Sequence, residues 1–215
     1  MKSYIVIGLG RFGSEVARRL CELGCEVLAL DSHSELVQQV SNDVTHGVVA
    51  DARDKEVLRA LGTANFDCAI VAIGGSLADS VLATMNLKEL GVPYIVAKAH
   101  DETHRHVLQK LGADRVVIPE QENAFRLARS LSAPNVLDYI EISSDYGIIE
   151  VPAPVRWYDK SLQELNVRAK LGVTIIAVKH GSEITVSPAA QFRIRQDDIL
   201  VILGDTDALN EVQKL

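Results

Sequence analysis

Three glycines and one aspartate near the start of the chain have the types and spacing of a nucleotide-binding site. Gly8, Gly10 and Gly13 follow an apolar, β-branched run, and a second apolar run ends in Asp31. In such a pattern the first glycine permits a tight turn, the second lets phosphates approach the backbone, and the third lets a helix pack on the strand. The acid accepts hydrogen bonds from ribose hydroxyls and repels a 2′-phosphate, which disfavours NADP. The alternative is a glycine-rich turn without a ligand.

Arg11 lies between the second and third of these glycines, in the first turn of the helix predicted to follow. A cation there opposes the helix macrodipole at a cost of roughly 0.3–1 kcal/mol, and a bound anion turns that cost into a gain. Free N–H groups in the same turn also favour an anion. A long side chain that extends into water explains Arg11 equally well, so this residue alone does not decide the matter.

Strand and helix alternate from the N-terminus to about residue 120. Apolar runs predict strands over residues 4–7, 27–30, 46–50, 68–73, 94–97 and 115–118. The predicted helices between them mostly end at a glycine. Short apolar strands separated by helices indicate a parallel sheet that is covered on both faces. The predicted fold class is therefore α/β, with a Rossmann-like, doubly wound parallel sheet.

Polar residues follow the strands at the edge where this fold binds ligands. Asp31, Asp51, Gly74, Lys98 and Glu120 each lie at or just past the carboxyl end of a predicted strand. Ligands of open α/β sheets bind in the crevice at that edge. Each of these residues alone is compatible with an ordinary polar loop, but together with the glycine pattern they predict one site.

The pattern changes beyond about residue 120. The predicted domains are residues 1–120, a linking helix within 121–138, and a small α+β lobe over 139–215. The linking helix covers 122–132 and is expected to break at Ala133-Pro134-Asn135. In the lobe we expect strands over 146–151 and 198–203, a hairpin of 173–178 with 183–186, a helix over 161–170 closed by Gly172, and a short helix from Thr206.

Composition narrows the function classes. The chain has 215 residues, a net charge of −7 and a pI near 5.4, so it lacks the basic surplus that neutralises phosphates in a nucleic-acid-binding protein. Its three cysteines, Cys21, Cys25 and Cys68, are too few for a disulfide framework and are expected to be small buried hydrophobes. No signal peptide or membrane-spanning run is visible, which predicts a soluble cytoplasmic protein.

An NAD-dependent oxidoreductase is the main enzymatic alternative, and an NAD(H)-sensing regulator is the other. Tyr94 and Lys98 have the Tyr-x-x-x-Lys spacing of short-chain dehydrogenases, but on a strand they would lie about 13 Å apart, so the match is interpreted as a coincidence. The histidines of residues 100–106 do not complete a metal site and predict a solvated helix start. No Walker sequence or helix-turn-helix segment is present.

Several segments together resemble one family. They are Arg11 and Phe12 in the glycine loop, Ala72-Ile73-Gly74, and residues 112–120, 166–170 and 197–204. With them the chain resembles the cytoplasmic regulatory subunits of Ktr- and Trk-type potassium uptake systems, which contain an RCK (or KTN) N-lobe and C-lobe. The resemblance covers nearly the whole chain and is closer to Ktr, because full-length Trk subunits carry two tandem copies.

The resemblance implies a regulatory protein rather than an enzyme, in which ATP and ADP compete for one site and favour open or closed states of a channel. NAD and NADH are alternative ligands. The nucleotide-binding positions that match are Gly8, Gly10, Arg11, Phe12 and Gly13 for phosphates, Asp31 for ribose, Asp51 and Ala52 for adenine, and Ile73, Gly74, Lys98 and Glu120 in the crevice. Ser32 is a further binding position. Arg11 would bond the γ-phosphate, in its own subunit or in a partner's.

Glu120 has two alternative roles. It either holds Mg²⁺, Ca²⁺ or Na⁺ beside a triphosphate, or it points to solvent or pairs with Lys98. The resemblance further implies homodimers that assemble into an octameric ring, bound through a membrane pore subunit to the inner face of the cell membrane. Potassium-translocating pore subunits of this kind are the expected partners.

A second ligand is implied for the C-lobe. In some Ktr subunits this lobe binds cyclic di-AMP as a dimer, and the matching positions here are Val167, Arg168, Thr174 and Pro188. A guanidinium suits phosphate oxygens, and a proline can stack on a base. Thr174 departs from the Asn of some binders. The alternative is that Arg168 is a cation near a helix C-terminus that interacts favourably with the dipole.

Overall fold

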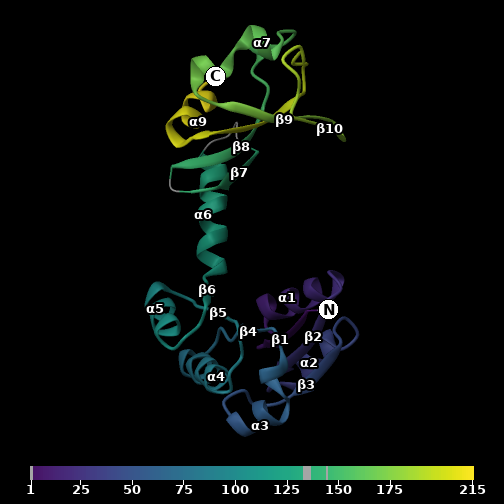
Figure 1. Ribbon diagram of the computed structural model, residues 1–215, viewed down its shortest axis with the longest axis vertical. Coiled ribbons are helices and arrows are strands. Elements are labelled where there is room, and N and C mark those ends of the chain that lie inside the picture. Colours follow the sequence, from purple (N-terminus) through teal and green to yellow (C-terminus); the bar gives the residue numbers. More distant parts are fainter. Residues whose placement is uncertain (1, 133–136, 144) are drawn as a thin grey trace. The chain divides into compact units, whose positions relative to one another are not determined.

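The computed structural model describes residues 2–132, 137–143 and 145–215. The chain divides into two compact units, Met1–Gln121 and Glu122–Leu215. The first unit contains a parallel sheet with strands in the order β3-β2-β1-β4-β5-β6 (Figure 1). Its strands are β1 (Ser3–Ile7), β2 (Glu26–Asp31), β3 (His46–Val49), β4 (Cys68–Val71), β5 (Ile95–Lys98) and β6 (Arg115–Val117). This is the order of a doubly wound dinucleotide fold, so the predicted fold class is confirmed.

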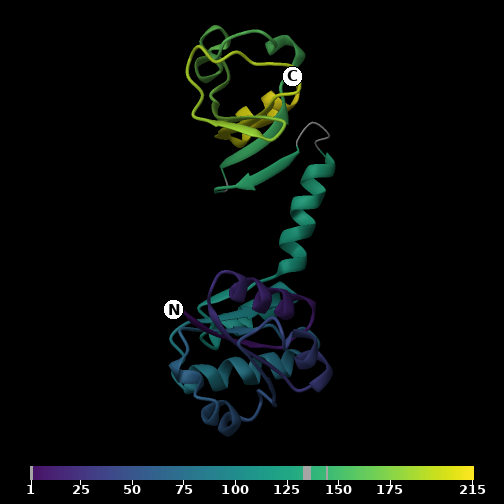
Figure 2. The same ribbon diagram turned by 90° about the vertical axis from the view of Figure 1, so that its right-hand side faces the viewer.

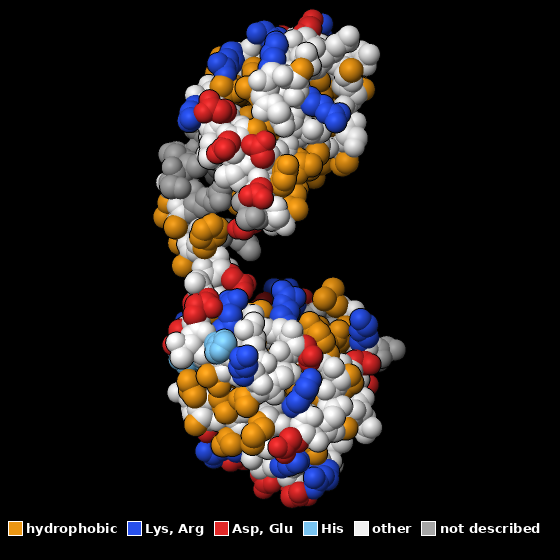
Figure 3. Space-filling view, turned by 60° about the vertical axis from the view of Figure 1, so that its left-hand side comes forward, with side chains coloured by type: hydrophobic (Ala, Val, Ile, Leu, Met, Phe, Trp, Pro, Cys, Tyr) orange, Lys and Arg blue, Asp and Glu red, His pale blue; other side chains and the backbone are white. Residues whose placement is uncertain are grey.

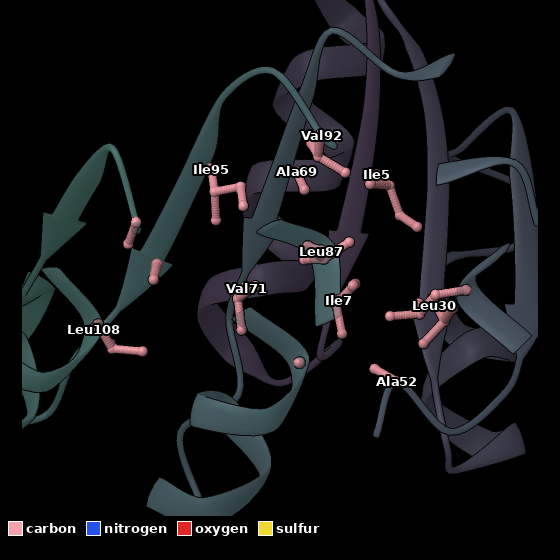
Figure 4. Close-up of a cluster of buried hydrophobic side chains, with 14 of the residues drawn as sticks. Ile5, Ile7, Leu30, Ala52, Ala69, Val71, Leu87, Val92, Ile95 and Leu108 are labelled. Atoms are coloured by element: carbon pink, nitrogen blue, oxygen red, sulfur yellow. The ribbon is translucent and has the colours of Figure 1, made fainter. Parts of the chain in front are cut away.

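Helices cover both faces of this sheet. On one face α1 (Arg11–Glu22) and α2 (Ser34–Val40) pack against Val6 and Ala29. On the other, α3 (Lys55–Ala60), α4 (Leu77–Glu89) and α5 (Glu102–Lys110) pack against Ile5 and Ile7. Figure 4 shows Ile5 and Ile7 among the buried side chains of this second face. Because successive side chains of a strand point to opposite faces, a strand buried on both faces reads as a continuous apolar run.

The second unit is built around an antiparallel sheet (Figure 2), whose strands are in the order β10-β9-β11-β8-β7. Its strands are β7 (Asp138–Glu141), β8 (Tyr146–Pro152), β9 (Thr174–His180), β10 (Glu183–Val186) and β11 (Ile199–Asp205). Its helices are α6 (Pro119–Ser132), α7 (Leu162–Leu165), α8 (Val167–Leu171) and α9 (Thr206–Gln213). Helix α6 begins at the end of the first unit. Buried Ile149, Leu200 and Ile202 lie at its core. The small α+β lobe is thus confirmed.

Two details of this unit differ from the predictions. The single helix over residues 161–170 is wrong: α7 and α8 are separated by Asn166, whose φ of 48° lies in the left-handed region. Asparagine adopts this conformation more readily than most residues. The residues on either side of Asn166 have helical i-to-i+4 periodicity, so the sequence pattern does not reveal the break. The strand β7 was not predicted. The expected helix break at 133–135 lies outside the described residues. Gly172 closes α8 in the left-handed region, as predicted.

Among the helices in the part of the chain that the structure describes, none is long and apolar enough to cross a membrane.

Candidate functional site

A cavity of about 550 Å³ opens at the carboxyl ends of β1, β2, β3 and β4. Its lining includes these residues that the sequence predicted: Gly8, Gly10, Asp31, Ser32, Asp51, Ala52, Ile73 and Gly74. It also includes others that the sequence did not single out, among them His33, Leu36, Arg53, Ser76 and Asp79. The structure therefore brings the residues predicted for ribose, adenine and part of the phosphate loop into one pocket of a size usual for small-molecule ligands.

Close packing fixes the glycine loop. Gly8 has a φ of 92°, which L-residues rarely adopt. A Cβ placed on Gly13 would lie 1.8 Å from the carbonyl oxygen of Gly8, so α1 reaches the loop only because position 13 has no side chain. At Gly10 a Cβ would meet nothing within 4 Å, and the backbone there is extended, with φ −65°. The open space at Gly10 faces the pocket and is free for a ligand.

Asp31 ties the loop to the end of β2. Its Oδ2 accepts a hydrogen bond from the Leu9 amide at 2.7 Å, and its Oδ1 accepts one from the His33 amide at 2.9 Å. His33 Nδ1 also lies 3.0 Å from Oδ1. Burial raises the pKa of this carboxyl, but the hydrogen bonds from Leu9 and His33 outweigh it, so the pKa lies below its ordinary value. Asp31 is therefore an ionised acceptor whose three contacts leave about one further position for a hydrogen-bond donor.

Arg53 connects two loops of the pocket. Its Nη2 lies 2.7 Å from Asp51 Oδ2 and its Nη1 lies 3.4 Å from Asp79 Oδ1, at the first turn of α4. The hydrogen bond from Arg53 holds the pKa of Asp51 below its ordinary value. Asn86 of α4 donates to the Arg53 carbonyl oxygen at 2.9 Å and to that of Ala52 at 3.4 Å. The loop of residues 51–53 thus contacts α4 through the side chains of Arg53, Asp79 and Asn86.

Arg11, Phe12, Lys98 and Glu120 lie beside the pocket rather than in its lining. Lys98 Nζ is 2.7 Å from Glu120 Oε1, 5.7 Å from the centre of the Phe12 ring, and 3.7 Å from where a Cβ on Gly74 would stand. The hydrogen bond from Lys98, and to a smaller extent the charge of Arg11, hold the pKa of Glu120 below its ordinary value. Of its two predicted roles, Glu120 has the Lys98 pairing in this structure.

Two motifs that the sequence analysis set aside are the Tyr94–Lys98 pair and the histidines of residues 100–106. Tyr94 precedes β5 and Lys98 ends it, so the two lie at opposite ends of a strand, as predicted. Among the described residues, no group of three or more His, Cys, Asp or Glu side chains is placed to hold a metal. The predicted solvated start of α5 is wrong for His104, which is only 1% exposed. Burial raises the pKa of the Cys68 thiol to about 11, as expected of an inert cysteine.

The residues predicted for a second ligand lie along the start of α8 and the hairpin. Val167 is buried at the start of α8, and Arg168 is exposed beside it. Thr174 is an exposed residue at the start of β9, and Pro188 follows β10. Arg168 also lies in the last turn of the short α8, where a cation interacts favourably with the helix dipole. Both predicted roles of Arg168 therefore stay open.

Comparison with known proteins identifies the family. The family model of the TrkA-N domain matches residues 4–119, and that of the TrkA-C domain matches residues 147–215. Ktr system potassium uptake protein A of Bacillus subtilis (strain 168) is 46% identical over 203 residues, which cover 94% of this chain and 91% of that protein. The chain belongs to the RCK regulatory subunits of Ktr potassium uptake systems. The resemblance inferred from the motifs is thereby confirmed.

Two further comparisons agree with this family. Ktr system potassium uptake protein C of the same organism is 42% identical over 213 residues, which cover 99% of this chain and 96% of that protein. Among solved structures, the GsuK channel is 20% identical, with a TM-score of 0.70, and the match covers all of this chain and 39% of that one. This structural likeness shows that the chain has the same fold as part of that channel's chain.

Gly13 and Gly10 offer a matched test of the contact that holds the glycine loop against α1. We expect Gly13→Ala to lower the free energy of unfolding of the first unit by more than about 2 kcal/mol, because the methyl group overlaps backbone rather than a movable side chain. Gly10→Ala, which has room and a compatible φ, should change it by less than about 1 kcal/mol. Urea denaturation followed by circular dichroism measures both. Equal losses would show that the loop is not held by this contact.

Proposed function

We propose that this chain is a cytoplasmic regulatory subunit whose first unit binds an adenine nucleotide, and that ATP and ADP set the state of a potassium-translocating pore subunit. The observation that carries the proposal is the pocket itself, where the glycine loop, Asp31 and the Asp51–Ala52 loop line one cavity. Its position at the carboxyl ends of β1 to β4 is where doubly wound sheets bind nucleotides.

The charges of the pocket favour a nucleotide without a 2′-phosphate. Asp31 and Asp51 are acceptors for hydroxyl and amino groups, and Arg53, the cation in the lining, is already paired with two carboxylates. NADP sites instead offer an arginine to the 2′-phosphate. ATP, ADP and NAD(H) all satisfy this constraint. One solved structure of the GsuK channel is described as bound to NAD, so NAD(H) is retained as the alternative ligand.

We also propose that the subunit acts as a homodimer within an octameric ring. Helix α6 exposes Phe125, Leu127 and Leu131, and the second unit exposes Ile140 and Ile142. Figure 3 shows exposed hydrophobic side chains on both units. Apolar surface of this kind, on a protein whose relatives belong to a multisubunit system, supports contacts between subunits. The expectation that the second unit binds cyclic di-AMP rests on the resemblance and is kept as a proposal.

The ribose contact is tested at Asp31. Replacing Asp31 by Ala removes the acceptor, so the affinities for ATP and ADP should fall by a similar factor, about 10- to 100-fold, as for a lost hydrogen bond to a charged group. Calorimetric titration of each nucleotide measures this. Asp43→Ala, an exposed aspartate of the same unit that pairs with Arg18, is the control and should leave both affinities unchanged. Unchanged binding to a folded Asp31→Ala protein would rule out the assignment.

Arg11 should distinguish ATP from ADP. Arg11 starts α1 beside the pocket, and its charge acts on Glu120. Its guanidinium is therefore available to a phosphate at that edge of the pocket, and the γ-phosphate is the group that ADP lacks. Arg11→Ala should weaken ATP by about 1.5–3 kcal/mol and ADP much less. Arg19→Ala, an exposed arginine of the same helix that pairs with Glu15, is the matched control. Equal losses for the two nucleotides would make Arg11 a general phosphate contact.

The cation role of Glu120 is tested through its partner. A cation at Glu120 must displace the Lys98 amine, so we expect Mg²⁺ to strengthen ATP binding in the native chain and to have no such effect in Glu120→Gln. ATP affinity without metal should not fall in the variant, because Lys98 is released toward the phosphates. Glu122→Gln, at the next acid of α6, is the control. A magnesium effect that persists undiminished in Glu120→Gln leaves Glu120 only its pairing with Lys98.

A further inference from the structure

His104 is a buried histidine held between two hydrogen-bonding groups. Its Nδ1 lies 2.8 Å from Nδ1 of His100, and its Nε2 lies 3.2 Å from the hydroxyl of Ser80, which is fully buried on α4. The two imidazole rings are 4.6 Å apart between centres. His100 Nε2 in turn lies 3.3 Å from Asp101 Oδ2. Nothing in the proposed nucleotide site uses these groups. His104 and Ser80 are buried, whereas His100 and Asp101 are exposed, so solvent protons reach the pair through His100.

This geometry has room for one shared proton at the contact between the rings. An imidazole nitrogen either carries a hydrogen and donates, or has a lone pair and accepts. Two Nδ1 atoms at 2.8 Å form a hydrogen bond only when one donates and the other accepts. With both rings neutral, all three contacts are satisfied when His100 Nε2 donates to Asp101, His104 Nδ1 donates to His100 Nδ1, and the Ser80 hydroxyl donates to His104 Nε2. With one added proton they are satisfied when His100 donates to both Asp101 and His104, and His104 Nε2 donates to Ser80. Protonating His104 as well sets two N–H groups and two positive charges against each other.

The cluster adjoins the nucleotide pocket through the first turn of α4. Ser76, which caps α4, and Asp79 line the pocket, and Ser80 is the next residue along. Successive residues of a helix point in different directions, so this one turn contacts the pocket on one side and His104 on another. His100 follows Lys98 by two residues, and Lys98 pairs with Glu120 at the pocket's edge. The histidine pair is therefore connected, through Ser80 and along the chain to Lys98, to residues beside the pocket.

We propose that His100 and His104 form a one-proton switch for the nucleotide pocket: a second proton separates the two rings, loosens the first turn of α4 from α5, and so weakens nucleotide binding as the pH falls. This inference rests on the proposed function, since it assigns a regulation to the same pocket.

The charged groups near the pair determine the sign. Burial lowers the pKa of His104 most, the charge of His100 lowers it further, and Asp101 acts in the opposite direction. From α4 the facing group is the uncharged Ser80 hydroxyl. A histidine whose pKa is lower in the folded than in the unfolded state, where it is about 6.5, contributes its stability fully above that pH and loses it as the pH falls. Acid is therefore the destabilising direction.

The proton site can be tested on the full chain without nucleotide. Nuclear magnetic resonance of the histidine ring signals should give His104 a titration midpoint below that of His106, an exposed residue of the same helix. In His100→Gln, which removes the neighbouring charge, the His104 midpoint should rise toward that of His106. A His104 midpoint equal to or above that of His106 would overturn the proposal, and this result does not depend on nucleotide binding.

The coupling is tested by measuring ATP affinity between pH 7.5 and pH 5.5. For each unit by which the pH falls, the ATP affinity of the native chain should drop by up to tenfold more than that of His104→Gln. The glutamine amide keeps a donor and an acceptor but does not titrate. The nucleotide itself also titrates, but it is the same for the two proteins, so only the difference between their profiles reports His104. His106→Gln, the control, should follow the native chain. Identical pH profiles for the native chain and His104→Gln would overturn the coupling, whereas absence of ATP binding at every pH would overturn the proposed function.

Discussion

The approach of α1 to the glycine loop is the constraint on which the rest of the first unit depends. Because Gly13 has no side chain, the helix begins directly against the carbonyl of Gly8, and its first turn ends up beside the carboxyl end of β1. That position leaves the Leu9 amide facing Asp31, and the bond between them holds the end of β2 at the loop. The pocket is the space that these two contacts keep open.

Charge is distributed unevenly along that space. The end formed by Asp31, Asp51 and Asp79 is acidic, and its one arginine is neutralised by two of these carboxylates. Beside the pocket lie the cations Arg11 and Lys98, of which Lys98 is paired with Glu120. A ligand with hydroxyl and amino groups at one end and phosphates at the other matches this polarity, and it does so through fixed groups whose orientation is set before it arrives.

Much of this arrangement is predictable from the sequence because it is local. The six strands, the glycine loop and Asp31 each lie in a short stretch whose periodicity or residue types suffice to place them. The Arg53 contacts are different, since Asp79 and Asn86 come from a helix more than twenty residues further along the chain and no spacing rule connects them. The burial of His104 was also missed. This residue lies in a run of charged and polar residues that predicts an exposed helix start, and its contact with Ser80 of α4 joins residues far apart in the sequence. Asn166 was missed because helix propensity on both sides concealed a left-handed residue.

The strand order also has a consequence for how the chain folds. In the first unit β1 pairs with β2 and with β4. Tyr4 of β1 lies opposite Cys68 of β4, so these two strands pair across a long stretch of intervening chain. In the second unit β7 with β8 and β9 with β10 are hairpins between neighbours in sequence. Local hairpins form quickly, whereas non-local parallel pairing must first overcome the entropy of closing the loop. The second unit also needs non-local pairing, because β11 lies between β9 and β8 and Asp205 pairs opposite Tyr146. Neither sheet is therefore complete from local hairpins alone, and the pocket of the first unit forms only once β1 has paired with β4.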